Sequence, residues 1–384
     1  MSNHTNDPWE AEMSRTFDRR VHDLHEAPLS LDQVKGRAVR IRRNRRIAVA
    51  GGIVAAAAVI VPVVGFAGGA LTDNDTSPPV APQPNETAKD QGGPGFDYLE
   101  GDTLHLADGS TVRLPARYDT VTLLGDTVFA TLNDDDTGFK SLDMVDDSGD
   151  PHRLTEVIGA PIANDDHTLI AYVETDGDLI ARWDGGQRTV AGGLDDSAHI
   201  VAVTGGAGCD ADDCRIYLSG DWGTDPVVYD ADGDPEVAVP DVIAVNGVEG
   251  GIVTVQNEST DTGSCGGVYD LTLADYHWET CDYFLLEPSP DARYVEATHP
   301  YLDGFGNGWA AILDSRTGEE VARLEPQGAG ITETVWQDPA HLLVKAFDGQ
   351  AWSVYRLGTD GSQEIVLGPT AGTDMAPPYT LLGD

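Results

Sequence analysis

The chain has 384 residues, enough for one large domain with appended segments. It contains 23 Lys and Arg against 65 Asp and Glu, so its formal net charge is −42. The charge is unevenly distributed, with a net of +3 in residues 1–46, none in residues 47–70 and −45 in residues 71–384. Because so acidic a surface repels phosphate backbones, we exclude nucleic acid as a partner of the C-terminal part.

Residues 1–46 are predicted to form a basic, helical tail. Pro28 separates two helical segments, and Ser30 with Gln33 matches a capping box at the start of the second. A segment of this length cannot bury a core of its own, so its apolar stripe should contact a partner protein or lipid headgroups. That stripe recurs at steps of four and then three residues and consists of Trp9, Met13, Phe17, Val21 and Leu24.

Residues 47–70 are predicted to cross the membrane as one helix. The segment is uncharged and mostly apolar, and a helix of this length spans about 36 Å, more than the hydrocarbon core of about 30 Å. The positive-inside rule therefore predicts a single-pass protein of the cell membrane, with a cytoplasmic N-terminus and an extracytoplasmic C-terminal domain. The basic residues that anchor the helix at the inner headgroups include Arg42, Arg43, Arg45 and Arg46.

Two other interpretations of this segment are a cleaved signal peptide and a buried core helix, and the second is disfavoured because the segment does not alternate apolar with polar residues. A cleaved signal peptide would have a short basic region and an apolar core of about 7–15 residues, unlike the long tail and core found here. Small residues four apart, at Gly51 and Ala55 and at Gly65 and Gly69, also permit pairing of two helices and hence a homodimer.

Residues 71–95 are rich in Pro, Gly, Asp and Thr and contain few large apolar side chains. This composition predicts an extended spacer that holds the C-terminal domain, residues 96–384, away from the bilayer.

All four cysteines lie in the C-terminal domain. An even number of cysteines outside the membrane predicts two disulfides, Cys209–Cys214 and Cys265–Cys281. A zinc site is the less favoured alternative, because neither pair has C-x-x-C spacing and no histidine cluster accompanies them.

From residue 96 onward, short β-branched and aromatic runs alternate with Asp/Gly turns, and one turn-and-strand pattern recurs. A period of about 40–45 residues, with about four strands per unit, is typical of a β-propeller, in which each sheet is buried only by stacking on its neighbours. The residues that mark the repeated turn are Gly109, Gly149, Gly185, Gly233, Asp275, Gly318 and Gly361.

The two ends of the domain predict how the ring closes. Only residues 96–114 precede the next unit, and an apolar strand at Tyr379–Leu382 follows the last complete unit. We therefore expect both chain ends to share one blade, with the C-terminal strand innermost and the N-terminal strands outside it. This gives an all-β propeller of seven blades, with six blades and loose ends as the alternative.

Two segments, SPDARYVEA at 289–297 and GWAAILDSRTGEEVARL at 308–324, resemble the strand pairs of TolB-type and WD-repeat propellers. The other units match loosely, since Trp183–Asp184 is the only Trp-Asp pair and the Gly-His element of WD repeats is absent. The order of tail, anchor and propeller also resembles that of uncharacterised bacterial membrane proteins with external propellers. The resemblance implies a fold and a bacterial envelope location, and no catalytic residues.

The strongest metal candidate is Asp230, Asp232 and Asp234, whose carboxylates alternate as in a calcium loop. Pro235 follows where an EF-hand would need glycine, and the segment coincides with a repeated turn, so ordinary turn chemistry is preferred over calcium. No other cofactor is indicated. The sequence contains no G-x-S-x-G motif and its histidines are scattered among the units, so it predicts no catalytic site.

These features predict a membrane-anchored binding or scaffold protein of the bacterial envelope, whose acidic propeller engages a protein or an envelope polymer. One alternative is transmembrane signalling, in which the propeller alters what the tail binds, as in an anti-sigma-like regulator. The tail lacks the His/Cys cluster of zinc-containing anti-sigma factors. The other alternative is an extracytoplasmic hydrolase whose residues converge at the centre of the ring.

Overall fold

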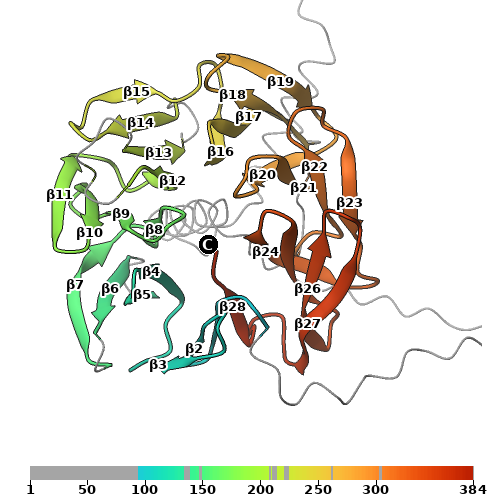
Figure 1. Ribbon diagram of the computed structural model, residues 1–384, viewed down its shortest axis with the longest axis horizontal. Helices are drawn as coiled ribbons and strands as arrows, with labels where there is room; N and C mark the ends of the chain where they lie inside the picture. Colours follow the sequence, from blue (N-terminus) through green and yellow to red (C-terminus); the bar gives the residue numbers. More distant parts are fainter. Residues whose placement is uncertain are drawn as a thin grey trace, which may run out of the picture. The chain divides into compact units, whose positions relative to one another are not determined.

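The computed structural model describes residues 94–133, 139–146, 149–206, 209, 214–219, 225–260, 263–301 and 305–383. These residues form seven four-stranded antiparallel sheets, set around one axis as the blades of a propeller (Figure 1). The prediction of an all-β ring with seven blades is confirmed. The predicted tail and membrane helix lie outside the described residues, among which no helix has the length and apolar character needed to cross a membrane.

Each blade has its innermost strand beside the axis and its outermost strand at the rim. From innermost to outermost, the strands of blade 1 are β28 (Tyr379–Leu381), β1 (Tyr98–Glu100), β2 (Thr103–His105) and β3 (Thr111–Arg113); of blade 2, β4 (Thr120–Leu124), β5 (Thr127–Asn133), β6 (Lys140–Val145) and β7 (Pro151–Val157); and of blade 3, β8 (Ile162–Ala163), β9 (Leu169–Val173), β10 (Leu179–Trp183) and β11 (Gly186–Ala191).

The remaining blades follow the same order. They are blade 4, with β12 (His199–Thr204), β13 (Arg215–Ser219), β14 (Val227–Asp230) and β15 (Pro235–Val237); blade 5, with β16 (Ala244–Glu249), β17 (Ile252–Thr260), β18 (Gly263–Asp270) and β19 (Asp275–Thr280); blade 6, with β20 (Phe284–Pro288), β21 (Tyr294–Thr298), β22 (Ala310–Asp314) and β23 (Glu320–Leu324); and blade 7, with β24 (Gly330–Asp338), β25 (His341–Phe347), β26 (Ala351–Gly358) and β27 (Gln363–Ala371).

The repeated turn of the sequence is the hairpin between the third and fourth strands of each blade. Its glycine markers adopt positive φ, for example 87° at Gly109 and 71° at Gly318, because only a residue without Cβ enters that region at no steric cost. In blade 5, where Asp275 is the marker, the preceding Ala274 takes the left-handed conformation instead, with φ of 52°.

The core lies between blades rather than within them. All five residues of β9 are buried, since a middle strand of a propeller blade packs against neighbours on both faces. One cluster joins blades 2 and 3 through Phe129, Leu142, Ile170 and Tyr172. Because the inner strands are covered on both faces, their sequences are nearly continuous apolar runs rather than a strict alternation of polar and apolar residues.

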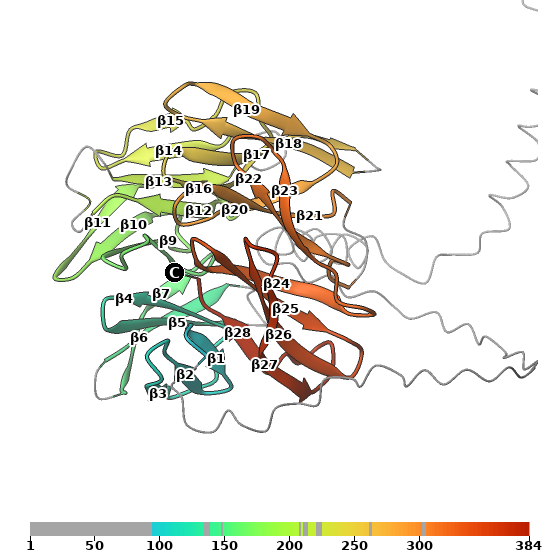
Figure 2. The same cartoon turned by 45° about the vertical axis from the view of Figure 1, so that its right-hand side comes forward.

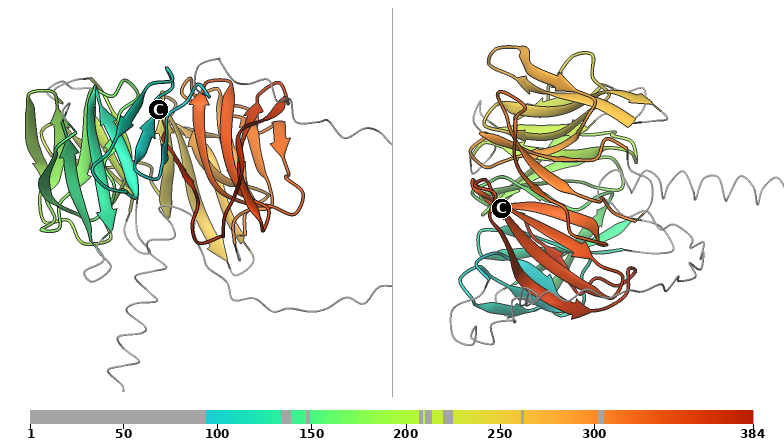
Figure 3. Two further views of the ribbon diagram at one scale, coloured as in Figure 1. Left: turned by 90° about the horizontal axis from the view of Figure 1, so that it is seen from below. Right: turned by 90° about the vertical axis from the view of Figure 1, so that its right-hand side faces the viewer.

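The ring has two faces, seen edge-on in Figure 3. At the turn face, each innermost strand turns back into the second strand, as at residues 164–168, 250–251, 289–293 and 339–340. At the linker face, the chain crosses from one blade to the next, as at residues 192–198 and 325–329, and the second strand turns into the third. All the innermost strands run from the linker face to the turn face.

The chain ends close the ring, as predicted. Strand β28 pairs with β1 in antiparallel register, Tyr98 opposite Leu381 and Glu100 opposite Tyr379, and lies beside β24 of blade 7 (Figure 2). The ammonium group of Lys345, a residue that is only 5% exposed, donates to the carbonyl oxygen of Tyr379 at 3.0 Å. It also pairs with the Glu333 carboxylate, which accepts a hydrogen bond from the backbone N–H of Leu381.

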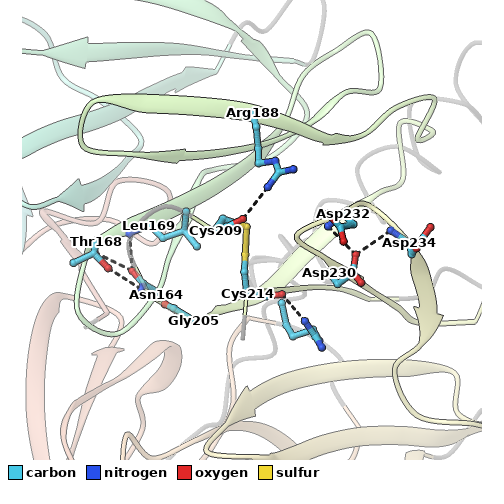
Figure 4. Close-up of a disulfide and its surroundings, with 11 residues drawn as sticks. Asn164, Thr168, Leu169, Arg188, Gly205, Cys209, Cys214, Asp230, Asp232 and Asp234 are labelled. Carbon is cyan, nitrogen blue, oxygen red and sulfur yellow. Dashed lines mark hydrogen bonds between the residues drawn. A yellow bond between two sulfur atoms is a disulfide. The ribbon is translucent and has the colours of Figure 1, made fainter. Parts of the chain in front are cut away.

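Both predicted disulfides are present. Cys265–Cys281 joins β18 to the residue after β19, within blade 5. Cys209–Cys214 closes the long connection between β12 and β13 at the turn face, and both its cysteines are buried in a core cluster. Figure 4 shows Arg188 donating to the carbonyl oxygen of Cys209 at 3.0 Å, which ties this connection to blade 3.

Replacing Lys345 by Ala should destabilise the closed ring. The change leaves Glu333 and the Tyr379 carbonyl without their cation, and removing one partner of a buried ion pair costs about 3 kcal/mol or more. Denaturant unfolding of the full chain measures the loss. The matched control is Arg113→Ala, which removes the exposed Arg113–Asp102 pair of blade 1 and should cost less than about 1 kcal/mol. Equal losses for the two variants would contradict a closing role for Lys345.

Candidate binding site at the propeller axis

The structure places the predicted calcium residues in the hairpin between β14 and β15. One carboxylate oxygen of Asp230 accepts the backbone N–H groups of Asp232 at 2.9 Å and of Asp234 at 3.1 Å (Figure 4). Gly233 has φ of 82°. This is an Asx turn, in which the Asp230 side chain pairs with backbone N–H groups of its own loop. This geometry agrees with the preferred turn interpretation, and calcium stays the less favoured, untested alternative.

Sequence inspection missed a different acidic group. Among the described residues, one group of three carboxylates has its oxygens within 4.8 Å of one another, formed by Glu174, Asp176 and Asp178. It lies in the turn between β9 and β10 at the linker face, and the backbone N–H of Asp178 donates to the Asp176 carboxylate. The tail stripe and the anchoring arginines lie outside the described residues.

A cavity of about 390 Å³ opens at the turn face. Its lining comes from the turns that follow the innermost strands of blades 3, 6 and 7. Because blades 3 and 7 stand on opposite sides of the ring (Figure 1), a cavity lined by both crosses the axis. The lining residues are Asp165, Asp166, His167, Pro290, Gln337, Asp338 and Pro339. We call this the axial cavity.

The blade 3 side of the axial cavity is held in a rigid turn. The buried Asn164 accepts the backbone N–H groups of Thr168 and Leu169 and donates to the carbonyl oxygen of Gly205 in blade 4. Asp166 accepts hydrogen bonds from Thr168 and Asn164, which lower the pKa of its carboxyl group. Asp166 is therefore ionised at neutral pH and faces the cavity with its position fixed.

Asp165 forms a carboxyl pair with Glu249, which lies at the end of β16 in blade 5. Burial, the negative charge of Asp165 and the hydrogen bond between the two groups raise the pKa of Glu249 to about 8. Glu249 is therefore mostly protonated at neutral pH and is hydrogen-bonded to the carboxyl group of Asp165. The bond connects two non-adjacent blades beside the axial cavity, and a cation that replaced the shared proton would gain both carboxylates.

The blade 7 side combines a charged turn with the start of the described chain. Asp338 accepts the backbone N–H of Ala340 and contacts the imidazole of His341 at 2.9 Å. Gln337 donates to the carbonyl oxygen of Gly95 at 2.9 Å and accepts from Arg356 at 2.8 Å. The Gln337 side chain therefore both lines the axial cavity and holds Gly95, near the start of the described propeller, by a hydrogen bond.

A further neutral carboxyl group lies between blades 6 and 7. Glu296 on β21 is 1% exposed and accepts a hydrogen bond from the Thr334 hydroxyl on β24. Burial, together with the charge of Glu287, raises the pKa of Glu296 to about 8, although the hydrogen bond opposes the shift. Glu296 is thus neutral in the folded protein at pH 7.

The sequence alone carried little signal for the axial cavity. Asp165, Glu249 and Asp338 each look like ordinary turn carboxylates in the sequence, and the contact between Asp165 and Glu249 spans 84 residues. A repeat-by-repeat alignment would have placed these residues at the ends of the innermost strands, and hence near one another. It would not have identified which of the many acidic turns converge.

Comparisons with known proteins identify no family for this chain. No protein-family model and no curated protein match the chain. A chain of the crystal structure of the mitotic checkpoint complex is 11% identical, with a TM-score of 0.44, covering 77% of this chain and 88% of that one. The computationally designed Ika8 protein is 13% identical, with a TM-score of 0.46, covering 73% and 85%. Neither similarity bears on function, and the TolB-type and WD-repeat resemblance finds no support in them.

The buried Glu296 should make stability depend on pH. Its pKa is raised in the folded state, so its stabilising contribution is complete below the unfolded pKa of about 4.5 and is lost as pH rises to about 8. Relative to Glu296→Gln, the wild-type chain should lose up to about 1.4 kcal/mol per pH unit across this window. Unfolding free energies of both proteins at several pH values measure the difference. Glu236→Gln, on the exposed strand β15, is the control and should run parallel to wild type.

Proposed function

We propose that this chain is a single-pass membrane protein whose extracytoplasmic propeller binds a cationic protein partner through the axial cavity. The observation that carries this proposal is the cavity itself. Aspartate side chains from opposite sides of the ring converge there, and the cavity has the volume of a ligand pocket, about 300–1,000 Å³. A lysine or arginine side chain projecting from a partner is the group that such a cavity would accept.

The charge of the whole domain favours the same class of partner. Residues 71–384 carry a net charge of −45, which attracts cationic proteins and accelerates their encounter in a salt-dependent manner. Within the cavity, Asp166 is fixed by its hydrogen bonds and Glu249 can exchange its proton for a cation. The long-range field would supply the association rate, and the converging carboxylates would supply the specificity.

The position at which the spacer joins the propeller favours a binding partner that lies near the membrane. Arg356 donates to the carbonyl oxygen of Pro94 at 2.8 Å, so the chain joins the propeller at the turn face, where the axial cavity opens. An extended spacer reaches at most about 3.3–3.6 Å per residue, so the 23 residues 71–93 can span at most about 76–83 Å. Within that distance the cavity can meet a partner anchored in the same membrane or lying on its surface.

The geometry favours binding over the hydrolase alternative. Glycoside hydrolysis uses two carboxyl groups about 5–9.5 Å apart, with room for a sugar or a water molecule between them. Asp165 and Glu249 are instead hydrogen-bonded to each other. The signalling alternative rests on the tail stripe and stays a prediction from the sequence.

The membrane topology can be tested by cysteine labelling of the full chain in intact cells. A maleimide that does not cross the membrane should label a cysteine introduced by Ser77→Cys and should not label one introduced by Ser14→Cys. The native cysteines are disulfide-bonded and give little background. Labelling at position 14 alone would show the reverse orientation and would contradict an extracytoplasmic propeller.

Binding through the axial cavity can be tested by calorimetry with the full chain in nanodiscs. A hexa-arginine peptide should bind in a salt-dependent manner, and Asp165→Asn with Asp338→Asn should weaken binding at least about tenfold, or about 1.4 kcal/mol.

The matched control removes the same charge elsewhere on the blades. Asp232→Asn with Asp234→Asn lies in an exposed turn of blade 4, outside the axial cavity, and should change affinity about twofold at most. If both double variants weaken binding equally, bulk charge attracts the peptide and the axial cavity is not the site.

A further inference from the structure

A second cavity, of about 440 Å³, lies at the linker face between blades 6 and 7. Its walls come from the β21–β22 connection, the start of β24, the β25–β26 turn and the β27–β28 connection. It therefore lies on the opposite face of the propeller from the axial cavity. We call it the glycine groove, because its lining residues include Gly306, Gly308, Gly328, Gly330 and Gly349.

Close backbone contacts fix the wall of the glycine groove. Asn307 and Ile331 exchange two backbone hydrogen bonds, of 2.8 and 2.7 Å, which join blade 6 to the beginning of strand β24 in blade 7. A Cβ at Gly306 would lie 2.5 Å from the Ile331 carbonyl oxygen, and one at Gly330 would lie 2.6 Å from the Phe305 carbonyl oxygen. These two glycines are needed for the backbones to approach, so the wall is preformed.

Other glycines leave the groove open. A Cβ added at Gly308, Gly328 or Gly349 would meet no heavy atom within 4 Å. No described residue accepts a hydrogen bond from the backbone N–H of Gly328 or Gly349. Peptide groups that a side chain would otherwise cover are thus available to a ligand as donors and acceptors.

Aromatic rings form the apolar part of the groove. The half-buried Phe305 packs edge-on against Phe347, with ring centroids 5.9 Å apart, and against Trp352 at 6.3 Å. Trp352 in turn donates its indole N–H to the carbonyl oxygen of Thr373, which holds the neighbouring Asp374 at the rim of the groove. The rings are therefore held in place by packing. A ligand that covers Phe305 restricts this side chain little further, so binding costs little conformational entropy.

One acidic side chain completes the lining. Asp374 is exposed at the rim of the glycine groove, where its oxygens can accept hydrogen bonds from a ligand. The side-chain Oδ1 of Asn307 has no hydrogen-bond partner among the described residues, but the atom itself is buried, so it contributes no contact to the groove.

The combination of groups restricts the ligand chemistry. A phosphate or carboxylate would satisfy the peptide N–H groups but would face Asp374. An ammonium or guanidinium group would satisfy Asp374 but would leave those N–H groups unpaired, because it carries no acceptor. Hydroxyl groups both donate and accept, and a ring with C–H groups on one side can cover Phe305.

We propose that the glycine groove binds a neutral saccharide unit, with its hydroxyl groups on Asp374 and the glycine peptide groups and its C–H side against Phe305. This site is separate from the axial cavity and does not depend on the function proposed for it. A glycan ligand would give the propeller a second attachment point on the face opposite to the one where its spacer joins.

Gly308→Leu provides a direct test, since position 308 does not have a positive φ and has open space for the new side chain. The full chain in nanodiscs is titrated with maltotriose, cellotriose and tri-N-acetylchitotriose, and binding is followed by calorimetry and tryptophan fluorescence. We expect at least one of the three to bind saturably, and Gly308→Leu and Asp374→Ala each to weaken its binding at least tenfold. Gly206→Leu, with equal space and no positive φ at the turn face, should bind as wild type does.

Three outcomes would overturn the proposal. The first is that none of the three oligosaccharides binds saturably. The second is that Gly308→Leu binds sugar as wild type does while unfolding at the wild-type temperature. The third is that Gly308→Leu abolishes binding of a tri-arginine peptide while leaving sugar binding intact, which would assign the groove to a basic protein partner. The double variant Asp165→Asn with Asp338→Asn separates this proposal from the one for the axial cavity. If it loses binding of the hexa-arginine peptide but still binds the sugar, the axial cavity and the glycine groove are independent sites.

Discussion

The pairing of β28 with β1 is the constraint on which the rest of this structure depends. A propeller blade cannot bury both of its faces alone, so each sheet needs a neighbour on either side. The chain meets this requirement by joining its two ends in one blade. Lys345 then connects that blade to blade 7 by contacting the Tyr379 carbonyl and Glu333 together. A cation with so little exposure is costly to desolvate, and these oxygen partners are what make its position tolerable.

Closure of the ring also creates the sites. The innermost strands run in one direction, so their ends converge at the turn face, and carboxylates from blades 3, 5 and 7 meet there. Burial, and then the charge of the neighbouring Asp165, raises the pKa of Glu249, because both disfavour a second negative charge at this position. The surrounding acidic surface makes this site attractive to cations, while the hydrogen bonds of Asn164 and Asp166 hold its blade 3 side in place.

The two faces differ in their chemistry. The turn face presents ionised side chains on rigid turns, and the described chain begins there. The linker face between blades 6 and 7 presents peptide groups, aromatic edges and the Asp374 side chain in the glycine groove. The two binding proposals therefore place a charged partner on one face and a neutral, hydroxyl-rich ligand on the other.

The sequence by itself predicted the repeat, a preference for seven blades over six and the manner of closure, and the tertiary structure decided for seven. Tight hairpins demand positive φ, so Gly109, Gly149, Gly185, Gly233, Gly318 and Gly361 reveal the repeat directly. It also predicted both disulfides, because pairing within a short segment is a local property. The axial cavity, the Lys345 contacts and the glycine groove were decided only by the tertiary structure. Each of them joins residues from different blades, and no local pattern records which of many similar turns the closed ring brings together.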